Sequence, residues 1–304
     1  AWVRRFSGPA DVRWFGAVGD GVTDDGAAFA GALAALGALA TTVSIYGRFL
    51  PVLSVPAGHY FLGTTTLNLI ATTTIRGVGG RGGQASRLRW AAGATGIRVQ
   101  AYNTDGASGV RTPAFEGAHS LIEGLKIEGG FGGAEGEFHG IHLRAAATIR
   151  DCMIANWPGD GIRAAASAGA GTNAPFEGNV NVFRIENVWC HGNRNGLYLD
   201  GADANAGLTS GLNCTYKRQA GIFDSSYLGN THVGAHLEEN GISPGVTPCR
   251  VSHNGHIYCC IAGQEAGAAT NAPSGTSADN GYWAWQEPGT ADASRNIAAW
   301  TSGT

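Results

Sequence analysis

The sequence has few charged residues and lacks any apolar run long enough to cross a membrane. Charged residues make up 14% of the 304 residues, and the net charge is -3. The basic residues are almost all arginines and are scattered without a run or stripe, so we do not expect nucleic acid as a partner. The longest apolar candidate is alanine-rich, weakly apolar and interrupted by glycine, so we expect no membrane insertion.

The sequence also lacks a cysteine pattern that would bind zinc. Its cysteines show no paired C-x-x-C spacing, so we expect no metal site. Two of them, Cys190 and Cys214, occupy the same place in successive repeats described below. Buried free thiols stacked in a core are therefore favoured over a disulfide framework. The cysteines are Cys152, Cys190, Cys214, Cys249, Cys259 and Cys260.

Glycine, by contrast, is abundant, with 49 residues, and 43% of the chain is apolar. This composition is typical of many short strands separated by tight turns. The length allows either one large domain or two ordinary ones, and the composition favours one.

The stretch from Val12 to Asp25 predicts a strand, a glycine turn and the start of a helix. Gly19 and Gly21 supply the backbone freedom that a tight turn needs. Asp24 and Asp25 come directly before an alanine-rich helical segment, where carboxylates can accept the unpaired amide hydrogens. We therefore interpret these carboxylates as helix caps and not as catalytic groups.

The same stretch, FGAVGDGVTDD followed by an alanine-rich helix, resembles the N-terminal signature of the pectate-lyase superfamily. A later segment, Pro56 to Tyr60, is similar to the P-x-G-x-Y step of that superfamily. Its members include polysaccharide lyases, glycoside hydrolases, alginate epimerases and bacteriophage spikes. The resemblance implies an all-β fold: a right-handed parallel β-helix with an N-terminal capping α-helix. In type, the chain most resembles spikes of phages or phage-like particles, which implies a homotrimer.

A recurring pattern supports a solenoid: an apolar residue, a polar turn with asparagine, then glycine and an aliphatic residue. One such repeat cannot bury its apolar side chains alone, but stacked repeats can. We expect an inner column of stacked aliphatic residues and a ladder of turn asparagines. The repeats are residues 154–162, 190–197, 214–222 and 228–235; the column is Ile141, Ile162, Leu197 and Ile222; the ladder is Asn156, Asn193 and Asn230.

These patterns divide the chain into three parts. Residues 1–50 hold the signature turn and the capping helix, and residues 51–262 form the parallel β-helix. Residues 263–304 are expected to be an irregular C-terminal extension that continues into further chain or packs on a partner.

Polysaccharide-active β-helices need either a carboxylate pair or a base with charge neutralisation. The hydrolase branch of the superfamily carries an Asn-Thr-Asp element followed by an aspartate pair and Gly-His-Gly. Residues 103–105 match only the first element, which we interpret as a turn. Candidate catalytic residues lie instead on the repeat surfaces, with solvated strand-end charges as the alternative interpretation. They are Asp200, Asp224, His236 and Glu238.

Aromatic residues near the repeat turns are candidates for stacking on sugar rings. The candidate substrate-binding residues are Trp157, Tyr198 and Tyr216. Strand alternation can also place some of these side chains inside the coil.

The leading functional hypothesis is spike-type recognition of a bacterial capsular polysaccharide or exopolysaccharide, with or without depolymerase activity. The alternative is a secreted polysaccharide lyase or glycoside hydrolase, and a third class is a structural or adhesin-like solenoid. We expect an extracellular location or one on the surface of a virion or particle, other particle proteins as partners, and no cofactor. Calcium is the alternative if the protein is a lyase.

Overall fold

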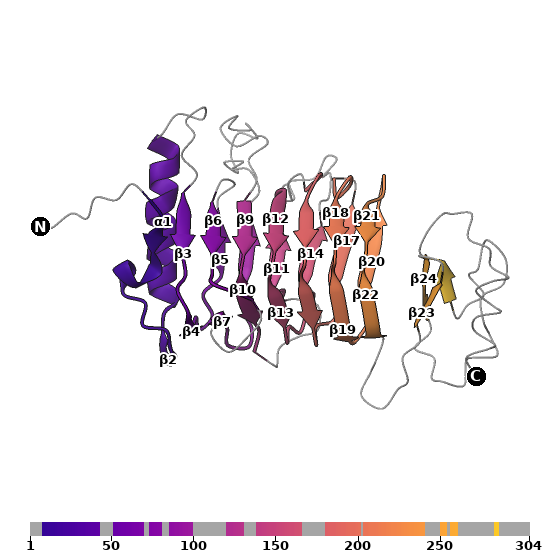
Figure 1. Cartoon of the computed structure of the whole chain (residues 1–304), viewed down its shortest axis with the longest axis horizontal. Coiled ribbons are helices and arrows are strands. Elements are labelled where there is room, and N and C mark those ends of the chain that lie inside the picture. The colour runs from indigo at the N-terminus through magenta and orange to yellow at the C-terminus, as the bar shows by residue number, and fades with distance from the viewer. Residues whose placement is uncertain are drawn as a thin grey trace, which may run out of the picture.

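The structure, a computed structural model, is built mainly of short strands. It describes residues 8–42, 51–69, 73–80, 85–99, 120–130, 138–165, 180–201, 203–240, 250–253, 256–260 and 283–285. The strands form three parallel sheets, A, B and C, which wind as a right-handed parallel β-helix beside one long helix, α1 (Gly26–Thr42) (Figure 1). The expected fold class is confirmed. In this part of the chain, no helix is long and apolar enough to span a membrane.

Each of the six turns from β3 to β20 contributes one strand to each sheet, whereas the first and last described turns contribute strands to sheets A and B alone. Sheet A contains β1 (Ala10–Asp11), β3 (Val52–Ser54), β6 (Thr74–Arg76), β9 (Ser120–Glu123), β12 (Ala147–Arg150), β15 (Arg184–Glu186), β18 (Leu208–Ser210) and β21 (Thr231–Val233). Sheet B contains β2 (Asp20–Asp24), β4 (Gly58–Phe61), β7 (Ser86–Arg89), β10 (Leu125–Glu128), β13 (Met153–Ala155), β16 (Trp189–His191), β19 (Asn213–Lys217) and β22 (His236–Asn240). Sheet C contains β5 (Leu67–Leu69), β8 (Ile97–Val99), β11 (Ile141–Leu143), β14 (Ile162–Ala165), β17 (Leu197–Gly201) and β20 (Ile222–Ser226).

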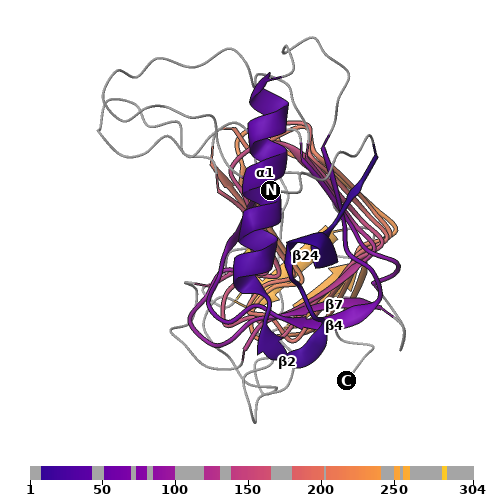
Figure 2. The same ribbon diagram turned by 90° about the vertical axis from the view of Figure 1, so that its left-hand side faces the viewer.

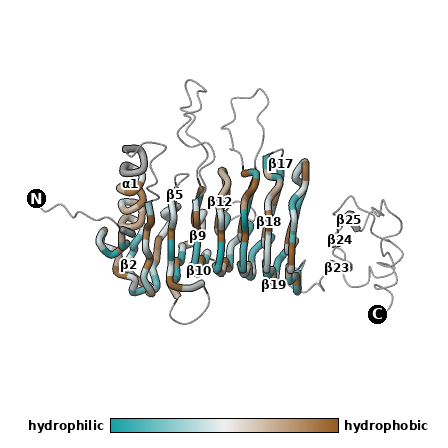
Figure 3. The backbone as a smooth tube through the Cα atoms, turned by 45° about the horizontal axis from the view of Figure 1, so that its top comes forward, coloured by the Kyte–Doolittle hydropathy of each residue, from teal (hydrophilic) through white to brown (hydrophobic). Residues whose placement is uncertain are grey.

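The expected column of aliphatic residues runs along the inside of sheet C. Ile141 pairs with Ile162, Ile162 with Leu197, and Leu197 with Ile222, and all are buried. The column also extends toward the N-terminus through Ile97 and Leu67. Because side chains alternate between the two faces along a strand, the residue that follows each of these aliphatic residues points outward. Figure 3 shows the resulting mixture of apolar and polar segments along each coil.

Sheet B places the two expected cysteines over one another in the core. Cys190 pairs in register with Cys214, between Ile154 on one side and Leu237 on the other. Neither cysteine is part of a disulfide, and both thiols are buried, as is the thiol of Cys152. The prediction of stacked free cysteines is therefore confirmed.

Helix α1 lies across the N-terminal opening of the coil (Figure 2). Phe29 is fully buried, and its ring contacts that of Tyr60 edge-on at 5.4 Å. Asp24 accepts a hydrogen bond from the amide of Gly26 at the helix start, whereas Asp25 accepts the amides of Val18 and Gly19 in the preceding turn. The signature carboxylates therefore stabilise backbone amides, as expected, but only Asp24 bonds to a helix amide.

In the five coils from β9 to β22, the turn that leads from sheet A to sheet B contains a residue in the left-handed conformation. These positions are Gly124, Asp151, Asn187, Gly211 and Gly234, all with φ between 50° and 65°. Glycine, asparagine and aspartate are the residues that tolerate this conformation best. Asn187 also donates to Asp151 of the preceding coil at 2.7 Å.

The expected asparagine ladder is wrong in its positions. Asn193 lies fully buried between sheets B and C, where it bonds to Trp157 and to Ile154. Asn230 lies in a different turn, between β20 and β21, and accepts the amide of Gly207. The strand register therefore separates residues that share a place in the sequence pattern.

The parallel β-helix among the described residues ends at β22, before the expected limit of residue 262. β23 (Arg250–His253) and β24 (His256–Cys260) pair antiparallel, and β24 also pairs antiparallel with β25 (Trp283–Trp285). The link between β23 and β24 is too short for a parallel crossover, which needs about a dozen residues. The sequence analysis placed strands β23 and β24 in the parallel coil, but their antiparallel pairing shows that they do not continue it.

Candidate functional site

The outer face of sheet C carries a continuous row of arginine, histidine and aromatic side chains. Each member follows an aliphatic residue of the inner column, so it points to the opposite face. Each is partly exposed. We call this row the outer column of sheet C, and it consists of Arg98, His142, Arg163, Tyr198 and Phe223.

The C-terminal half of this column is a stack of flat groups. The rings of Tyr198 and Phe223 are nearly parallel, with centroids 4.7 Å apart. The guanidinium of Arg163 lies 4.5 Å from the centre of the Tyr198 ring, and that of Arg194 lies 5.8 Å away. Cation–π contacts of this kind fix the orientation of both partners. The stack therefore presents a rigid edge to an approaching ligand.

A buried aspartate, Asp160, holds the arginines of this region in place. It is 0% exposed and accepts hydrogen bonds from Arg163, Arg194 and Asn195, the last at 2.7 Å. Two guanidinium groups thus share one carboxylate. Because a buried carboxylate needs such partners, Asp160 is a structural anchor for the cationic groups around it.

Two histidines beside this anchor are neutral at physiological pH. Burial, reinforced by nearby arginines, lowers the pKa of both His139 and His142 to about 3. The backbone amide of Asp160 donates to Nδ1 of His139 at 3.0 Å, which agrees with an unprotonated Nδ1. The 3.4 Å approach of that nitrogen to the Asp160 carboxylate is consequently not an ion pair.

Two nitrogens on the outer column lack hydrogen-bond partners within the described part of the chain. They are Nε of Arg98 and Nε2 of His142, and both are buried. Burial, together with the nearby charge of Arg144, also lowers the pKa of Arg98. The charged form of Arg98 is thus disfavoured here, and a bound anion would stabilise it.

The outer face of sheet A shows what a neutralised row looks like. There, Glu123 lies between Arg76 and Arg150 in register and forms ion pairs with both. On sheet C, Arg98 pairs in register with His142, which is followed by Arg163. In this column a neutral histidine, and not a carboxylate, lies between the two arginines, so sheet C is the face suited to an anionic ligand.

Of the predicted catalytic residues, only Asp200 lies beside the outer column of sheet C. Its carboxylate accepts a hydrogen bond from Ser225 at 2.9 Å and a long one from Tyr198 at 3.5 Å. Burial, followed by the charge of Asp200, raises the pKa of the Tyr198 phenol. Tyr198, predicted to bind substrate, is thus at the centre of the site.

Asp224 lies at an inward position of sheet C, in register with Leu199. Burial alone would raise its pKa, but hydrogen bonds from His232, Ser226 and Asn230 lower the pKa to about 2. Asp224 is therefore part of a polar cluster inside the last coils and does not face the outer column of sheet C.

His236 and Glu238 lie on the outer face of sheet B, in register with Asn213 and Thr215. Their side chains are exposed and approach each other to 3.3 Å. Tyr216, predicted to bind substrate, lies on the neighbouring strand β19 and is 52% exposed. The four predicted catalytic residues are consequently divided among three places, and the expected single acid/base cluster is not formed.

Trp157 does not contact the surface, which corrects its assignment as a substrate-binding residue. It is 1% exposed, and its ring packs against that of Trp90 with centroids 5.6 Å apart. Its indole nitrogen donates to the carbonyl of Ile127. Trp157 lies in the turn from sheet B to sheet C with its side chain directed into the coil, so it is a core residue.

The sequence analysis missed Arg98, His142, Arg163 and Phe223 as site residues. The signal was nevertheless present, because His142, Arg163, Tyr198 and Phe223 each follow a member of the predicted inner column directly. Selecting the residue that directly follows each aliphatic residue of the inner column would have identified four of the five members of the outer column of sheet C.

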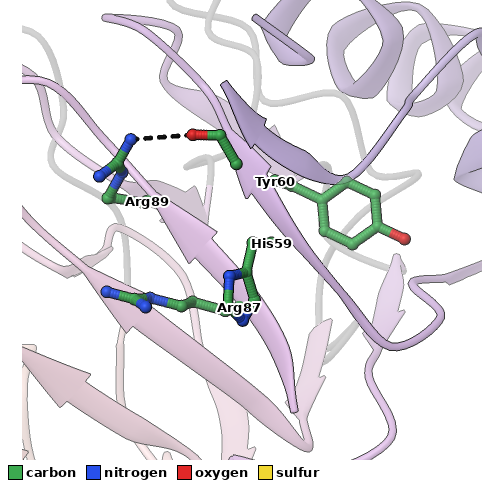
Figure 4. A pocket seen from close by; sticks show the side chains of 5 residues that line it. His59, Tyr60, Arg87 and Arg89 are labelled. Atoms are coloured by element: carbon green, nitrogen blue, oxygen red, sulfur yellow. Dashed lines mark hydrogen bonds between the residues drawn. The ribbon is translucent and has the colours of Figure 1, made fainter. Parts of the chain in front are cut away.

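A small pocket lies apart from sheet C, next to the signature turn. His59, Tyr60, Arg87 and Arg89 line it, and Arg89 donates to the carbonyl of Gly21 at 3.0 Å (Figure 4). Its volume is about 60 Å³. Ligand pockets usually measure about 300–1,000 Å³, so this one is too small for a sugar residue.

Nothing in the described ranges suggests a resident metal, since no group of three or more histidine, cysteine or acidic side chains is arranged to hold an ion.

The fold and the site together define the class of this protein. It is a right-handed parallel β-helix, with a row of arginine, histidine and aromatic side chains along one outer sheet.

Solved structures of known proteins share this fold. ORF18 of Geobacillus virus E2 superposes with a TM-score of 0.50 at 15% identity, covering 79% of this chain and 44% of the viral protein. This chain therefore spans less than half of that protein. The A-module of the mannuronan C-5 epimerase AlgE4 from Azotobacter vinelandii is 14% identical with a TM-score of 0.32, covering 76% of this chain and 78% of the module. No family model and no curated protein sequence matches this chain.

Proposed function

We propose that this protein recognises an acidic polysaccharide of a bacterial surface, in the manner of a spike, along the outer column of sheet C. The observation that carries the proposal is the row of nitrogen donors along this column, with arginine charges on either side of a neutral histidine. Arg98 and His142 have buried nitrogens without hydrogen-bond partners in the described chain, and Arg163 is fixed against Tyr198. A capsular polysaccharide or exopolysaccharide with carboxylate groups matches these donors in charge and in hydrogen bonding.

The geometry of the column suits a long ligand. Its members repeat once per coil, at the strand spacing of about 4.8 Å. The arginines would bind carboxylates, and the exposed edges of Tyr198 and Phe223 would contact the apolar faces of sugar rings. An extended chain lying along the coil axis would meet both kinds of group in succession.

Binding measurements on arginine variants test this function. In isothermal titration with a panel of acidic and neutral bacterial polysaccharides, we expect affinity for acidic ones that falls with salt. Arg98→Gln should weaken it, because this substitution removes one guanidinium charge from the column. Arg184→Gln, on exposed sheet A, makes the same charge change elsewhere and should leave binding intact. Equal effects of the two variants would refute a role for sheet C.

The particle context is a second part of the proposal. The likeness in fold to a viral protein and the resemblance of the N-terminal signature to spikes support an extracellular place on a virion or similar particle. We propose a homotrimer for the same reason, with other particle proteins as partners. Light scattering with size-exclusion chromatography would measure the mass of the assembly, and a monomer at all concentrations would exclude the trimer.

A second candidate function is cleavage of the bound polymer by β-elimination, and His142 favours it. The imidazole of His142 is unprotonated at neutral pH, and its Nε2 has no hydrogen-bond partner in the described chain, so it is available as a base. The carboxylate of a bound uronate would raise its low pKa toward the range that proton transfer needs. It would take the C5 proton of a uronate, the electron pair would form the C4=C5 double bond, and the C4–O bond would break, the leaving oxygen taking a proton from water. Hydrolysis is less suited, because Asp200 has no second predicted catalytic carboxylate beside it.

Product analysis separates the two candidates. A lyase would generate the absorbance of an unsaturated uronate, and His142→Gln would abolish it while polymer binding persisted. Binding without any new chain ends would leave recognition as the function.

A further inference from the structure

The outer face of sheet B carries a separate aromatic cluster, built on β16 and β19. The rings of Trp189 and His191 are 5.5 Å apart, and those of His191 and Tyr216 are 5.2 Å apart, both edge-to-face. The hydroxyl of Thr215 accepts from the indole of Trp189 at 2.9 Å and contacts Nδ1 of His191 at 3.0 Å. These bonds fix the orientation of the Trp189 and His191 rings.

Tyr216, a member of this cluster, has a backbone conformation that is unfavourable for an aromatic residue. Its φ of 57° lies in the left-handed region. By strand register, the corresponding residues of the two preceding coils are Asn156 and Gly192, with φ of 65° and 64°. Asparagine and glycine tolerate this conformation, whereas an aromatic residue does so at a cost in free energy. An exposed tyrosine retained at such a position indicates a function for its ring.

The next strand adds polar groups beside the aromatic cluster. His236 and Glu238 on β22 are in register with Asn213 and Thr215 on β19, and their side chains are 59% and 58% exposed. The Glu238 carboxylate can accept hydrogen bonds from sugar hydroxyls, but it repels an anion. The exposed carboxylate of Glu238 thus distinguishes this surface from the outer column of sheet C, which carries arginines.

We infer that this surface is a second carbohydrate site, which binds a neutral pyranose residue. We call it the sheet B patch: Trp189, His191, Tyr216, His236 and Glu238. The sugar ring stacks on Tyr216, and its hydroxyl groups donate to Glu238 and bond with His236. An uncharged sugar fits both the exposed aromatic ring and the carboxylate, whereas a uronate does not. The inference does not depend on the function proposed for sheet C.

Saturation-transfer NMR with the full chain tests this site directly. The probes are the methyl glycosides of glucose, galactose, mannose, rhamnose, N-acetylglucosamine and N-acetylgalactosamine, each alone, with methyl glucuronide as the charged comparison. We expect transfer to at least one neutral sugar. Tyr216→Asn should weaken that binding by roughly two- to tenfold, the range expected for loss of one aromatic contact. Since asparagine accepts the left-handed backbone, this variant should fold at least as stably.

Two controls complete the experiment. Tyr216→Phe keeps the ring and should retain binding, and Tyr198→Ala alters only sheet C and should also retain it. The inference is overturned if no neutral sugar shows transfer, if methyl glucuronide binds better than every neutral sugar, or if Tyr216→Asn leaves transfer unchanged. Any of these results leaves acidic polymer binding on sheet C to be judged by the Arg98 variant.

Discussion

Arg163 lies with its guanidinium 4.5 Å from the centre of the Tyr198 ring, one coil further along sheet C. The same arginine bonds to the buried carboxylate of Asp160. One side chain thus connects the interior of a turn with the exposed aromatic stack. This arrangement lets a solenoid, whose coils contact only their neighbours, build one continuous binding edge.

The aromatic stack should contribute measurably to polymer binding. The substitution Tyr198→Ala removes the ring that contacts Phe223 and Arg163. The ring of Phe223 is then more exposed to water. We expect affinity for an acidic polysaccharide to fall about tenfold, equivalent to ~1.4 kcal/mol. Tyr198→Phe keeps the stack and should bind nearly as well, as measured by isothermal titration. Equal losses in both variants would mean that the hydroxyl, and not the ring, is what matters.

The inner column should determine the stability of the coil. Ile162 is fully buried between Ile141 and Leu197. Ile162→Ala should lower the free energy of unfolding by about 2–5 kcal/mol, and Ile162→Val by about 0.5–1.5 kcal/mol. Urea unfolding followed by circular dichroism measures both. Similar midpoints for all three proteins would contradict the central position of this column.

Acid should destabilise the protein through His139 and His142. Their folded pKa values are about 3, against 6.5 ordinarily. Between these values the unfolded chain binds more protons, so stability is full above pH 6.5 and falls as the pH drops toward 3. The slope is at most about 1.4 kcal/mol per pH unit for each histidine.

Urea midpoints at a series of pH values test this dependence. His142→Gln should flatten the decline, because one of the two titrating groups is removed. The exposed His236→Gln should leave it unchanged. An identical decline in both variants would show that His142 does not contribute to it.

Asp224 should act in a lower pH range. Its pKa is lowered from 3.8 to about 2, so its ionised form stabilises the fold above pH 3.8, and this contribution disappears as the pH falls through 2. Asp224→Asn should therefore be less stable than wild type at pH 6, and the gap should close in acid. Thermal unfolding at both pH values measures the gap, and Glu238→Gln serves as an exposed control. A gap that is independent of pH would contradict the role of the charge.

The core thiols should resist alkylation in the folded protein. Burial raises the pKa of Cys152 to about 12, and a hydrogen bond with Cys214 together with burial raises that of Cys190. Thiolate is the reactive form, so iodoacetamide should modify these residues only after urea is added. Mass spectrometry of labelled peptides locates the adducts. Rapid labelling of Cys190 without urea would contradict its buried position.

Sequence reasoning identified the fold because its signals are local and repeated. Ile141, Ile162, Leu197 and Ile222 recur with the same turn pattern, and stacking is the only way to bury them together. The site was harder to predict, since it depends on register between coils. Trp157 looked like an exposed turn residue, but the turn points inward, a fact that no single repeat reveals.

The asparagines show the same limit. Asn193 and Asn230 share a sequence pattern, yet they lie in different turns, because the number of residues per coil varies. Asp200 and Glu238 were likewise candidates for one catalytic cluster on the repeat surfaces, but they belong to different sheets. Only the pairing of strands decides which side chains share a face.

The most direct test of the proposed function changes the ligand and leaves the protein intact. An acidic polysaccharide that binds is compared, by isothermal titration at low salt, with the same polymer after its carboxylates are chemically reduced to alcohols. Recognition by the outer column of sheet C predicts that reduction abolishes most of the affinity, and that Arg98→Gln then has no further effect. Equal affinity for the acidic and the reduced polymer would contradict it.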